Sequence, residues 1–443
     1  GWISPLLIRL VVDSPNAGNW TSADFLDDGI LLTGDQSSWV VSLIELGNVV
    51  TPIPSGFLVN WTGRKWMALF PAPVFFLTWL LVLSTRSIPV LYAVRIVQGM
   101  AIGFAFTGVP MYIAEVAEPR LRGRLCTFVG FMWSLGILYQ FCLGPYLSYQ
   151  LYTWLTLAPT AVFMLTFFWF PRSPYQLLMK GESCQAAKSL AWFRGASGVE
   201  EVADELAKMK QSVFAEADRK AGWKDLIWTQ EGRKALAILQ LLAVLKVMTG
   251  GFVVQSYASQ ALSQVAEGKR PFSPHMGSIL MSLLTLAVTL ASGYFVDRLG
   301  RRPLLLVSSV ATTICCLLAF AYFLAESLLQ HDTPPFMAVL SFIAVVMSTS
   351  FSSFGLGTVS ITLRSELFPN TTRGLAIGIT STVLTFISFL ALKLHQVVAD
   401  GVGLYLDFLI YALFGAVGTV CIFLFVPETK GKTFDEIQTI LKR

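Results

Sequence analysis

The sequence predicts an all-α protein that crosses a membrane twelve times, and three observations predict this. The 443 residues are 54% hydrophobic and only 13% charged, whereas soluble proteins carry about 25% charged residues. Long uncharged runs recur along the chain, each close to the roughly 20 residues that cross a bilayer as a helix. A charged turn, Asp297-Arg298-Leu299-Gly300-Arg301-Arg302, separates two such runs, and Asn60-Trp61-Thr62-Gly63-Arg64-Lys65 separates two others.

The composition also argues against several classes of function. The net charge of +5 is explained by basic loops, so no nucleic-acid partner is expected. The six cysteines lie mostly in apolar runs and form no C-x-x-C pair, so we expect small buried side chains rather than disulfides or metal ligands. The three histidines are far apart in the sequence. No nucleophile–base set or phosphate loop stands out, so we expect no enzyme, no cofactor and no metal.

The predicted spans follow one another in order. Gly1 to Val12 is only about half a span, so we expect a first helix that is truncated at its N-terminus. A polar loop from Asp13 to Asp35 contains five aspartates, no Lys or Arg, and a glycosylation sequon at Asn19. Further spans are predicted at Ser37–Val59, Trp66–Ser84, Pro89–Ala114, Cys126–Pro145, Tyr152–Phe170, Ala235–Tyr257, Met276–Val296, Leu304–Leu324, Phe336–Ile361, Gly374–Leu394 and Leu404–Val426.

A long polar segment divides these spans into two halves. The predicted organisation is a transmembrane half at 1–171, a helical linker at 172–233, a second transmembrane half at 234–426 and a polar tail at 427–443. Arginines and lysines gather in the loops that follow even-numbered spans, in the linker and in the tail. Because basic loops favour the cytoplasmic side, we expect both termini and the linker to be cytoplasmic.

Three motifs occur once in each half. Gly63-Arg64-Lys65 matches the turn at Gly300-Arg301-Arg302, and Pro171-Arg172-Ser173-Pro174 matches Pro427-Glu428-Thr429-Lys430-Gly431. Glu115-Val116-Ala117-Glu118-Pro119-Arg120-Leu121-Arg122-Gly123 likewise matches Glu366-Leu367-Phe368-Pro369-Asn370-Thr371-Thr372-Arg373-Gly374. An internal repeat is a common way to build a transporter. Together, these motifs resemble the sugar porter family of the major facilitator superfamily, and among its members most resemble the facilitative trehalose and sugar transporters of insects.

The resemblance implies a charged gate at the cytoplasmic ends of the helices. Charged side chains there could pair across the two halves, hold that end shut, and let the halves rock apart when the pairs break. The alternative is that these charges only set the topology. The residues expected in this gate are Arg64, Glu115, Arg122, Asp297, Arg301, Arg302, Glu366, Arg373 and Glu428.

The chain departs from the family pattern in the gate and in the substrate path. Asn60 stands where an acid is usual, and Arg172 where a glutamate is usual. The family's Gln-Gln-x-Ser-Gly-x-Asn corresponds to Lys246-Val247-Met248-Thr249-Gly250-Gly251-Phe252, and its Trp to Ile361. The substrate-binding residues that the resemblance implies are Gly130, Lys246, Thr249, Phe252, Gln255, Ser256, Tyr257, Ser360 and Ile361.

Ionisable residues inside predicted spans are costly in lipid and usually face a partner or a cavity. Arg95 matches a family arginine that partners a first-helix acid in proton-coupled members. Ile3 occupies the position of that acid, so proton coupling by this route is not expected. Glu45 could instead pair with Arg95 or Lys246, or form a purely structural ion pair.

We therefore expect a carrier of a small organic solute that works by alternating access without covalent chemistry. The leading substrate is a sugar such as trehalose or glucose, moved by facilitated diffusion. The alternatives are a more hydrophobic solute, such as a lipophilic hormone or metabolite, and a sensor that binds solute without transporting it. The expected location is the plasma membrane, and the expected functional unit is a monomer in contact with lipid.

Overall fold

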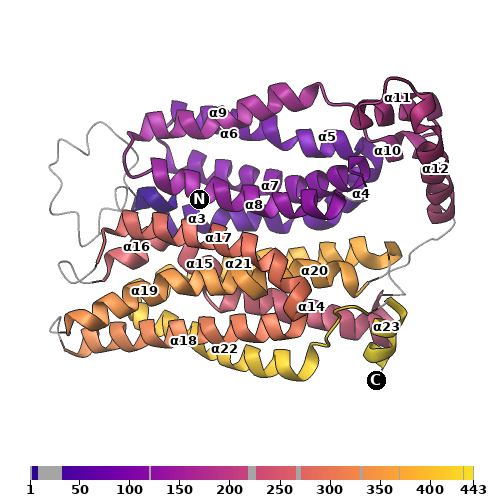
Figure 1. Ribbon diagram of the computed structural model, residues 1–443. Coiled ribbons are helices and arrows are strands. Elements are labelled where there is room, and N and C mark those ends of the chain that lie inside the picture. The colour runs from indigo at the N-terminus through magenta and orange to yellow at the C-terminus, as the bar shows by residue number, and fades with distance from the viewer. Residues whose placement is uncertain are drawn as a thin grey trace.

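The structure is a computed structural model in which residues 2–7, 32–118, 121–217, 226–265, 271–329, 333–368, 370–432 and 434–442 are described. The side chain of Cys126 and several others within these ranges lie outside the description, as does the predicted sequon at Asn19. The helices run roughly parallel to one another in two stacked groups (Figure 1). The end that carries the linker helices and the last helix is called the linker end below, and the other end the opposite end.

The first group contains the N-terminal helices, shown in indigo to magenta in Figure 1. A short 3-10 helix at Ser4–Leu6 precedes them. They are α3 (Gly34–Val49), α4 (Pro52–Thr62), α5 (Arg64–Leu69), α6 (Pro71–Ser84), α7 (Ile88–Val116), α8 (Arg122–Leu143) and α9 (Tyr149–Phe168).

The second group contains the C-terminal helices. They are α14 (Gln230–Met248), α15 (Gly251–Ser256), α16 (Ala258–Ser263), α17 (Pro274–Leu299), α18 (Arg301–Leu328), α19 (Pro335–Ser352), α20 (Thr358–Glu366), α21 (Asn370–Gly401) and α22 (Leu404–Phe425). A five-residue π-helical turn, Ser353–Gly357, joins α19 to α20.

The linker and the tail form small helices at one end of both groups. The linker contains α10 (Pro174–Met179), α11 (Ser183–Arg194) and α12 (Ala203–Ala217), and the tail contains α23 (Phe434–Lys442). Arg194 fastens the linker, because it bonds Glu205 through Nη2 at 2.6 Å and donates through Nη1 to the carbonyl of Val116 on α7 at 3.0 Å. Gln438 fastens the tail by donating to the carbonyl of Leu367 at 3.1 Å.

Several predicted spans are interrupted in the structure. Among the described residues, eight helical segments are long and apolar enough to cross a membrane, and Phe128–Leu143 is a shorter apolar helix. The predicted span Ser37–Val59 divides into α3 and α4 before Pro52, which lacks the N–H group that would continue the helix. The predicted span Ala235–Tyr257 divides after Met248, where the backbone turns at Gly250.

The surface of the spans is apolar, as a lipid environment requires. Large side chains such as Leu77, Trp154, Leu165 and Phe423 are exposed on the outside of their helices. Cys315 and Cys316 are buried, as expected. Cys142 and Cys184 are exposed, which corrects the expectation of buried cysteines, because their helices turn those positions away from the core.

Apolar side chains of the two groups share a buried cluster toward the opposite end. One cluster of buried side chains combines first-group residues such as Trp2 and Tyr152 with second-group residues such as Tyr257 and Phe408. A second cluster, toward the linker end, contains second-group residues alone, among them Leu239, Leu363 and Ile422. Of these two clusters of described residues, the first contains side chains of both groups and the second does not.

Candidate functional site

In the first group, the predicted gate residues Arg64 and Glu115 form a pair at the linker end. Arg64 opens α5, and its Nε donates to Glu115 Oε1 at 2.7 Å. Its Nη1 also donates to the carbonyl of Val59 at 3.4 Å. The second oxygen of Glu115 accepts from the hydroxyl of Ser173, at the start of the linker, at 2.5 Å.

The second group contains the same arrangement in equivalent residues. Arg301 opens α18, and its Nη2 and Nε donate to Glu366 Oε1 at 2.7 and 3.1 Å. Its Nη1 donates to the carbonyl of Val296 at 3.2 Å. The other oxygen of Glu366 accepts from the hydroxyl of Thr429, where the tail begins, at 2.6 Å.

The helix positions of these charges make the pairing informative. Each arginine stands at the first residue of a helix, where the helix dipole disfavours a cation. Glu115 and Glu366 stand in the last turns of α7 and α20, where the dipole disfavours an acid. All four charges are partly buried. Without its partner, each charge would be destabilised by the dipole of its own helix. The two residues of a pair therefore depend on each other.

The turns that bring the arginines into place require glycine. Gly63 and Gly300 have φ angles of +98° and +96°, which side chains of L-residues rarely adopt. A Cβ on Gly63 would stand 2.0 Å from the side-chain amide of Gln176, and one on Gly300 would stand 2.8 Å from Glu428. The repeated Gly-Arg motif therefore reflects a repeated backbone geometry.

The second group has one contact that the first lacks. Glu428 accepts hydrogen bonds from the backbone N–H groups of Arg301 and Arg302, both at 3.0 Å, and so caps α18. Burial acts to raise the pKa of the Glu428 carboxyl, but the backbone hydrogen bonds of Lys430, Arg301 and Arg302 outweigh burial and hold that pKa below its usual value. At the equivalent place in the first group the chain has the exposed Arg172.

The remaining predicted gate residues take other roles or lie outside the description. Arg302 donates to the carbonyl of Phe423, and its equivalent, Lys65, donates to the carbonyl of Phe168 at 2.8 Å. Arg373 donates to the carbonyl of Phe368 at 3.1 Å. The side chains of Arg122 and Asp297 are not among the described ones.

The expected pairing across the two halves differs from what the structure contains. Both described pairs of gate residues, Arg64–Glu115 and Arg301–Glu366, join helices of the same group. The physical reason is proximity, because each arginine follows a tight turn that ends beside the acidic helix of its own group. The second oxygen of each carboxylate accepts a hydrogen bond from a hydroxyl in the segment that follows the last membrane-spanning helix of its group.

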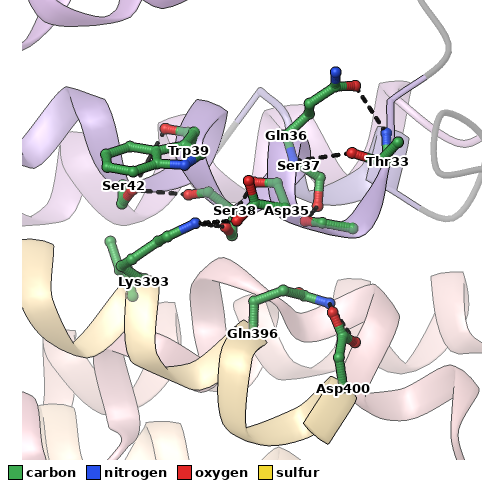
Figure 2. Close-up of polar contacts among 12 residues, drawn as sticks. Thr33, Asp35, Gln36, Ser37, Ser38, Trp39, Ser42, Lys393, Gln396 and Asp400 are labelled. Atoms are coloured by element: carbon green, nitrogen blue, oxygen red, sulfur yellow. Dashed lines mark hydrogen bonds and ion pairs between the residues drawn. The ribbon is translucent and has the colours of Figure 1, made fainter.

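Charged contacts between the groups occur at the opposite end, in residues that the sequence analysis did not single out. Lys393 on α21 donates to Asp35 Oδ1 at 2.5 Å and to the hydroxyl of Ser38 at 2.8 Å, both on α3 (Figure 2). Its ammonium also lies 4.4 Å from the ring centroid of Trp39. Asp400 accepts from Gln396 at 2.8 Å and approaches Gly34, the first residue of α3.

The predicted substrate-binding residues are divided between buried and open positions. Tyr257 is buried and donates to the carbonyl of Leu392 at 3.1 Å, and the Ser360 hydroxyl donates to the carbonyl of Leu356 at 2.5 Å. Thr249 is also buried, and its hydroxyl has no partner among the described residues. Ile361 is exposed. The others, partly buried, are Gly130, Lys246, Phe252, Gln255 and Ser256.

The buried charges inside the spans have different surroundings. The Arg95 guanidinium stacks on Trp2, 5.0 Å from the ring centroid, and its Nη1 donates to Gln98 at 3.3 Å. Glu45 on α3 and Lys246 on α14 are both partly buried and belong to different groups. The pairing of Glu45 with Arg95 or Lys246 stays a prediction.

Two further features were missed by sequence reasoning. His395 on α21 lies 3.0 Å from the Asp407 carboxylate on α22, and both side chains are 4% exposed. An acid in the first turn of a span, with a histidine near the end of the preceding one, was the available signal. Arg364, near the end of α20, has a buried Nε without a hydrogen-bond partner among the described residues. It was overlooked because it lies between Ile361 and the gate motif.

The comparisons with known proteins agree with this geometry. The family model described as "Sugar (and other) transporter" matches residues 19–441. The facilitated trehalose transporter Tret1 of Bombyx mori is 27% identical over 96% of this chain and 84% of its own length. The sugar transporter ERD6-like 7 of Arabidopsis thaliana is 28% identical over 93% of this chain and 86% of its own length.

Solved structures identify the fold. The xylose transporter XylE from E. coli, in an inward-open conformation, has a TM-score of 0.76 at 20% identity and covers 99% of this chain and 94% of its own. XylE with a bound glucose analogue, described as a proton:xylose symporter of the major facilitator superfamily, has a TM-score of 0.70 at 21% identity over the same shares of the two chains. The fold is that of the major facilitator superfamily, and the chain belongs to the sugar (and other) transporter family.

Proposed function

We propose that the protein is a facilitative sugar carrier that works by alternating access. The observation that carries this proposal is an asymmetry between the two ends. At the linker end, equivalent charge pairs bind helices within each group. At the opposite end, Lys393 and a shared apolar cluster join one group to the other. Among the described residues, these charge pairs at the linker end lie within a group, whereas the contact of Lys393 lies between the groups.

Such an arrangement is suited to a rocking motion of two bodies. The pairs Arg64–Glu115 and Arg301–Glu366 keep the helix ends of each group together while the groups move. Opening the opposite end requires Lys393 to leave Asp35 and Ser38, a contact that costs little because Asp35 is 71% exposed. Alternating access in related architectures is largely a rigid-body motion of this kind.

The proposed substrate is a sugar, with trehalose and glucose first. Relatives named as trehalose and sugar transporters support this class. A sugar needs donors and acceptors for its hydroxyls. The hydroxyls of Thr249 and Thr382 and the side-chain carbonyl of Gln240, which have no partner among the described residues, could supply some of them. The proposed binding residues remain Gly130, Lys246, Thr249, Phe252, Gln255, Ser256, Tyr257, Ser360 and Ile361.

Facilitated diffusion is the proposed mode of transport. The position at which proton-coupled relatives of this type carry an acid is Ile3, a buried apolar residue. Arg95 packs against Trp2 and bonds Gln98. The chain therefore lacks a carboxylate at the position beside Arg95 where proton-coupled members of the family have one. Such a carboxylate would be needed to carry a proton by this route.

We further propose the membrane arrangement expected from the positive loops. The linker end is cytoplasmic, both termini lie on that side, and the protein acts as a monomer in the plasma membrane. The proposed parts are the halves 1–171 and 234–426, the linker 172–233 and the tail 427–443.

A second candidate function is transport of a more hydrophobic solute. Phe252 stands where sugar carriers of this family have asparagine, and Val247 where they have glutamine. A site with side chains that hydrogen-bond hydroxyls strongly rejects compounds that lack hydroxyls. A site without those side chains does not reject them, so apolar side chains at these positions favour a more hydrophobic solute.

The two candidates are separated by counterflow in proteoliposomes that contain the purified protein. Vesicles loaded with unlabelled trehalose or glucose should accumulate the labelled sugar without an imposed proton gradient. Loss of that accumulation in Thr249→Val, with retention in Lys188→Gln on the exposed face of α11, would support the proposed site. Accumulation of lipophilic metabolites alone would support the second candidate, and accumulation that requires a proton gradient would overturn the facilitative mode.

A further inference from the structure

A buried cluster of side chains in the second group lies against the helix break between α14 and α15. The break follows Met248 and turns at Gly250, whose φ angle of +83° is one that side chains of L-residues rarely adopt. A Cβ on Gly250 would collide with the ring of Tyr411 on α22. The Tyr411 ring therefore packs directly on the backbone of the break, where glycine leaves room for it.

The hydroxyl of Tyr411 meets a buried histidine that also contacts an acid. The Tyr411 hydroxyl oxygen lies 3.2 Å from His395 Nδ1 on α21. The same Nδ1 lies 3.0 Å from Oδ2 of Asp407, in the first turn of α22. All three side chains are buried. A phenol and a carboxylate thus share one ring nitrogen in a place that solvent barely reaches.

The two contacts of His395 Nδ1 require opposite protonation of that atom. A ring nitrogen without a proton can accept a hydrogen bond from the Tyr411 hydroxyl, whereas a protonated one donates to the Asp407 carboxylate. One nitrogen cannot do both at once. The first turn of a helix favours an acid, so Asp407 is a ready acceptor. A proton at Nδ1 therefore moves the hydrogen bond of His395 from Tyr411 to Asp407.

Two of the residues proposed to bind the solute lie on either side of the break. Thr249 precedes Gly250, and its carbonyl accepts from the thiol of Cys316 on α18 at 3.8 Å. Tyr257 follows α15, and its ring centroid lies 4.7 Å from that of His395. The Tyr257 hydroxyl donates to a backbone carbonyl of α21 at 3.1 Å. The cluster around His395 thus contacts the break at Gly250 and again at Tyr257.

Charged groups lie near His395 in the sequence of α21 and near the break on α14. Lys393, two residues before His395, donates to Asp35 of α3. Asp400, five residues after His395, accepts from a side-chain amide one turn earlier on α21 at 2.8 Å. On α14, Lys246 stands three residues before Thr249 and is partly buried. The two charges of α21 are therefore bonded to groups other than the histidine ring.

We propose that His395 is a positioning residue for the break, and that it holds Tyr411 against Gly250 while its Nδ1 carries no proton. A break held in this way keeps Thr249 and Tyr257 in place, so solute affinity should fall when Nδ1 gains a proton. Histidine is the side chain that ordinarily changes its charge between pH 5 and 8. This inference rests on the proposed carrier function and adds a pH-dependent control of its solute site.

Hydrogen–deuterium exchange of residues 249–257 in the purified full chain measures the break without reference to transport. Rates are compared at about pH 7.5 and about pH 5.5, after correction for the intrinsic pH dependence of exchange. Exchange in the wild type should be about two- to tenfold faster at the lower pH, as the loss of one hydrogen bond predicts. Tyr411→Phe, which keeps the ring and removes the hydroxyl, should exchange fast at both values. His395→Gln should show no pH dependence.

Counterflow in proteoliposomes then measures the effect on the solute. In the wild type, the half-saturation concentration for trehalose or glucose should rise about two- to tenfold between the same two pH values, with a smaller change in maximal rate. Tyr411→Phe and His395→Gln should abolish this rise. Two control variants should retain it. Tyr152→Phe removes a buried hydroxyl that donates to the carbonyl of Trp2 in the first group, and His275→Gln removes a histidine at the start of α17.

The two measurements separate failure of this inference from failure of the proposed function. Exchange of residues 249–257 that does not depend on pH in the wild type would overturn the inference, even in a protein that transports sugars. A pH dependence that persists in Tyr411→Phe would overturn it as well. The expected exchange pattern without counterflow of any sugar would support the role of His395 at the break and reject the carrier of sugars. Sugar counterflow with a half-saturation concentration that ignores pH would overturn the link between the break and the solute site.

Discussion

Both halves of the protein contain an equivalent cluster of charged residues at the linker end, and the cluster of the second half has more hydrogen bonds. In the second half, Arg301 binds Glu366 through two nitrogens, and Glu428 caps the helix that Arg301 begins. In the first half, Arg64 binds Glu115 through Nε, and the acid at the capping position is replaced by Arg172. A helix N-terminus favours an acid and disfavours a base. The second half is therefore held more firmly at the linker end than the first.

This difference indicates which half yields when the linker end closes or opens. Each cluster keeps the helix ends of its own half together during a rocking motion, and the cluster with fewer bonds does so less firmly. The first half has Arg172 and Asn60 at positions where the resemblance to the sugar porters implies acids. We infer that both halves move as bodies and that the second half is the more rigid of the two.

The largest expected effect comes from breaking the charge pairs. Arg301→Gln should destabilise the protein by about 2–3 kcal/mol, because it leaves a partly buried carboxylate with only a hydroxyl partner. Arg64→Gln should cost about half as much, because Arg64 supplies one bond to Glu115. Thermal unfolding of the two purified variants measures the order. Equal losses would contradict the proposed difference between the halves.

The next effect comes from exchanging the capping residues. Glu428→Gln should destabilise the protein by about 0.5–1 kcal/mol, because the cap on α18 loses its charge. Arg172→Glu should stabilise it by a few tenths of a kcal/mol to about 1 kcal/mol, since it returns an acid to the start of α5. The unfolding temperatures of both variants test this, with Lys188→Glu as a control for added negative charge elsewhere. If Arg172→Glu destabilised the protein, the charge of this one residue would not account for the difference between the halves.

The smallest effect is the pH dependence of that cap. Hydrogen bonds from the backbone hold the pKa of Glu428 below its ordinary value of 4.5. A carboxyl with a depressed pKa contributes stability above its unfolded pKa, and the contribution is lost as the pH falls through the lower folded value. The difference in stability between the wild type and Glu428→Gln should therefore be constant from pH 7 to about pH 5 and shrink below about pH 4. A difference that stays constant into strong acid would contradict this assignment.

Much of the architecture could be predicted from the sequence, because its signals are local. Runs of apolar residues predict the spans, and the turns at Gly63 and Gly300 predict where two of the basic side chains stand. The breaks were not predictable from hydropathy, since the division of the second span depends on Pro52, inside an apolar run. The sequence indicated which charged residues form ion pairs, but it did not indicate which residue each of them pairs with. Arg301–Glu366 and Arg64–Glu115 required knowledge of which helix ends lie side by side.

Contacts between distant segments explain the remaining omissions. Lys393 and Asp35 are 358 residues apart in the sequence, and nothing in either local pattern links them. His395 and Asp407 are close in sequence but lie on different helices, so their pairing depends on how α21 turns into α22. Long-range packing, rather than local propensity, determines these clusters.

Our central claim is that the two halves move as rigid bodies relative to each other. This motion opens the linker end and the opposite end alternately. Distances between spin labels at Thr62→Cys and Leu299→Cys, the equivalent positions before the two glycine turns, test it directly once the native cysteines are replaced. We predict two populations of distance in membranes, with the shorter one enriched when Lys393→Gln weakens the contact at the opposite end. A single distance that neither this variant nor a transported solute changes would contradict the account.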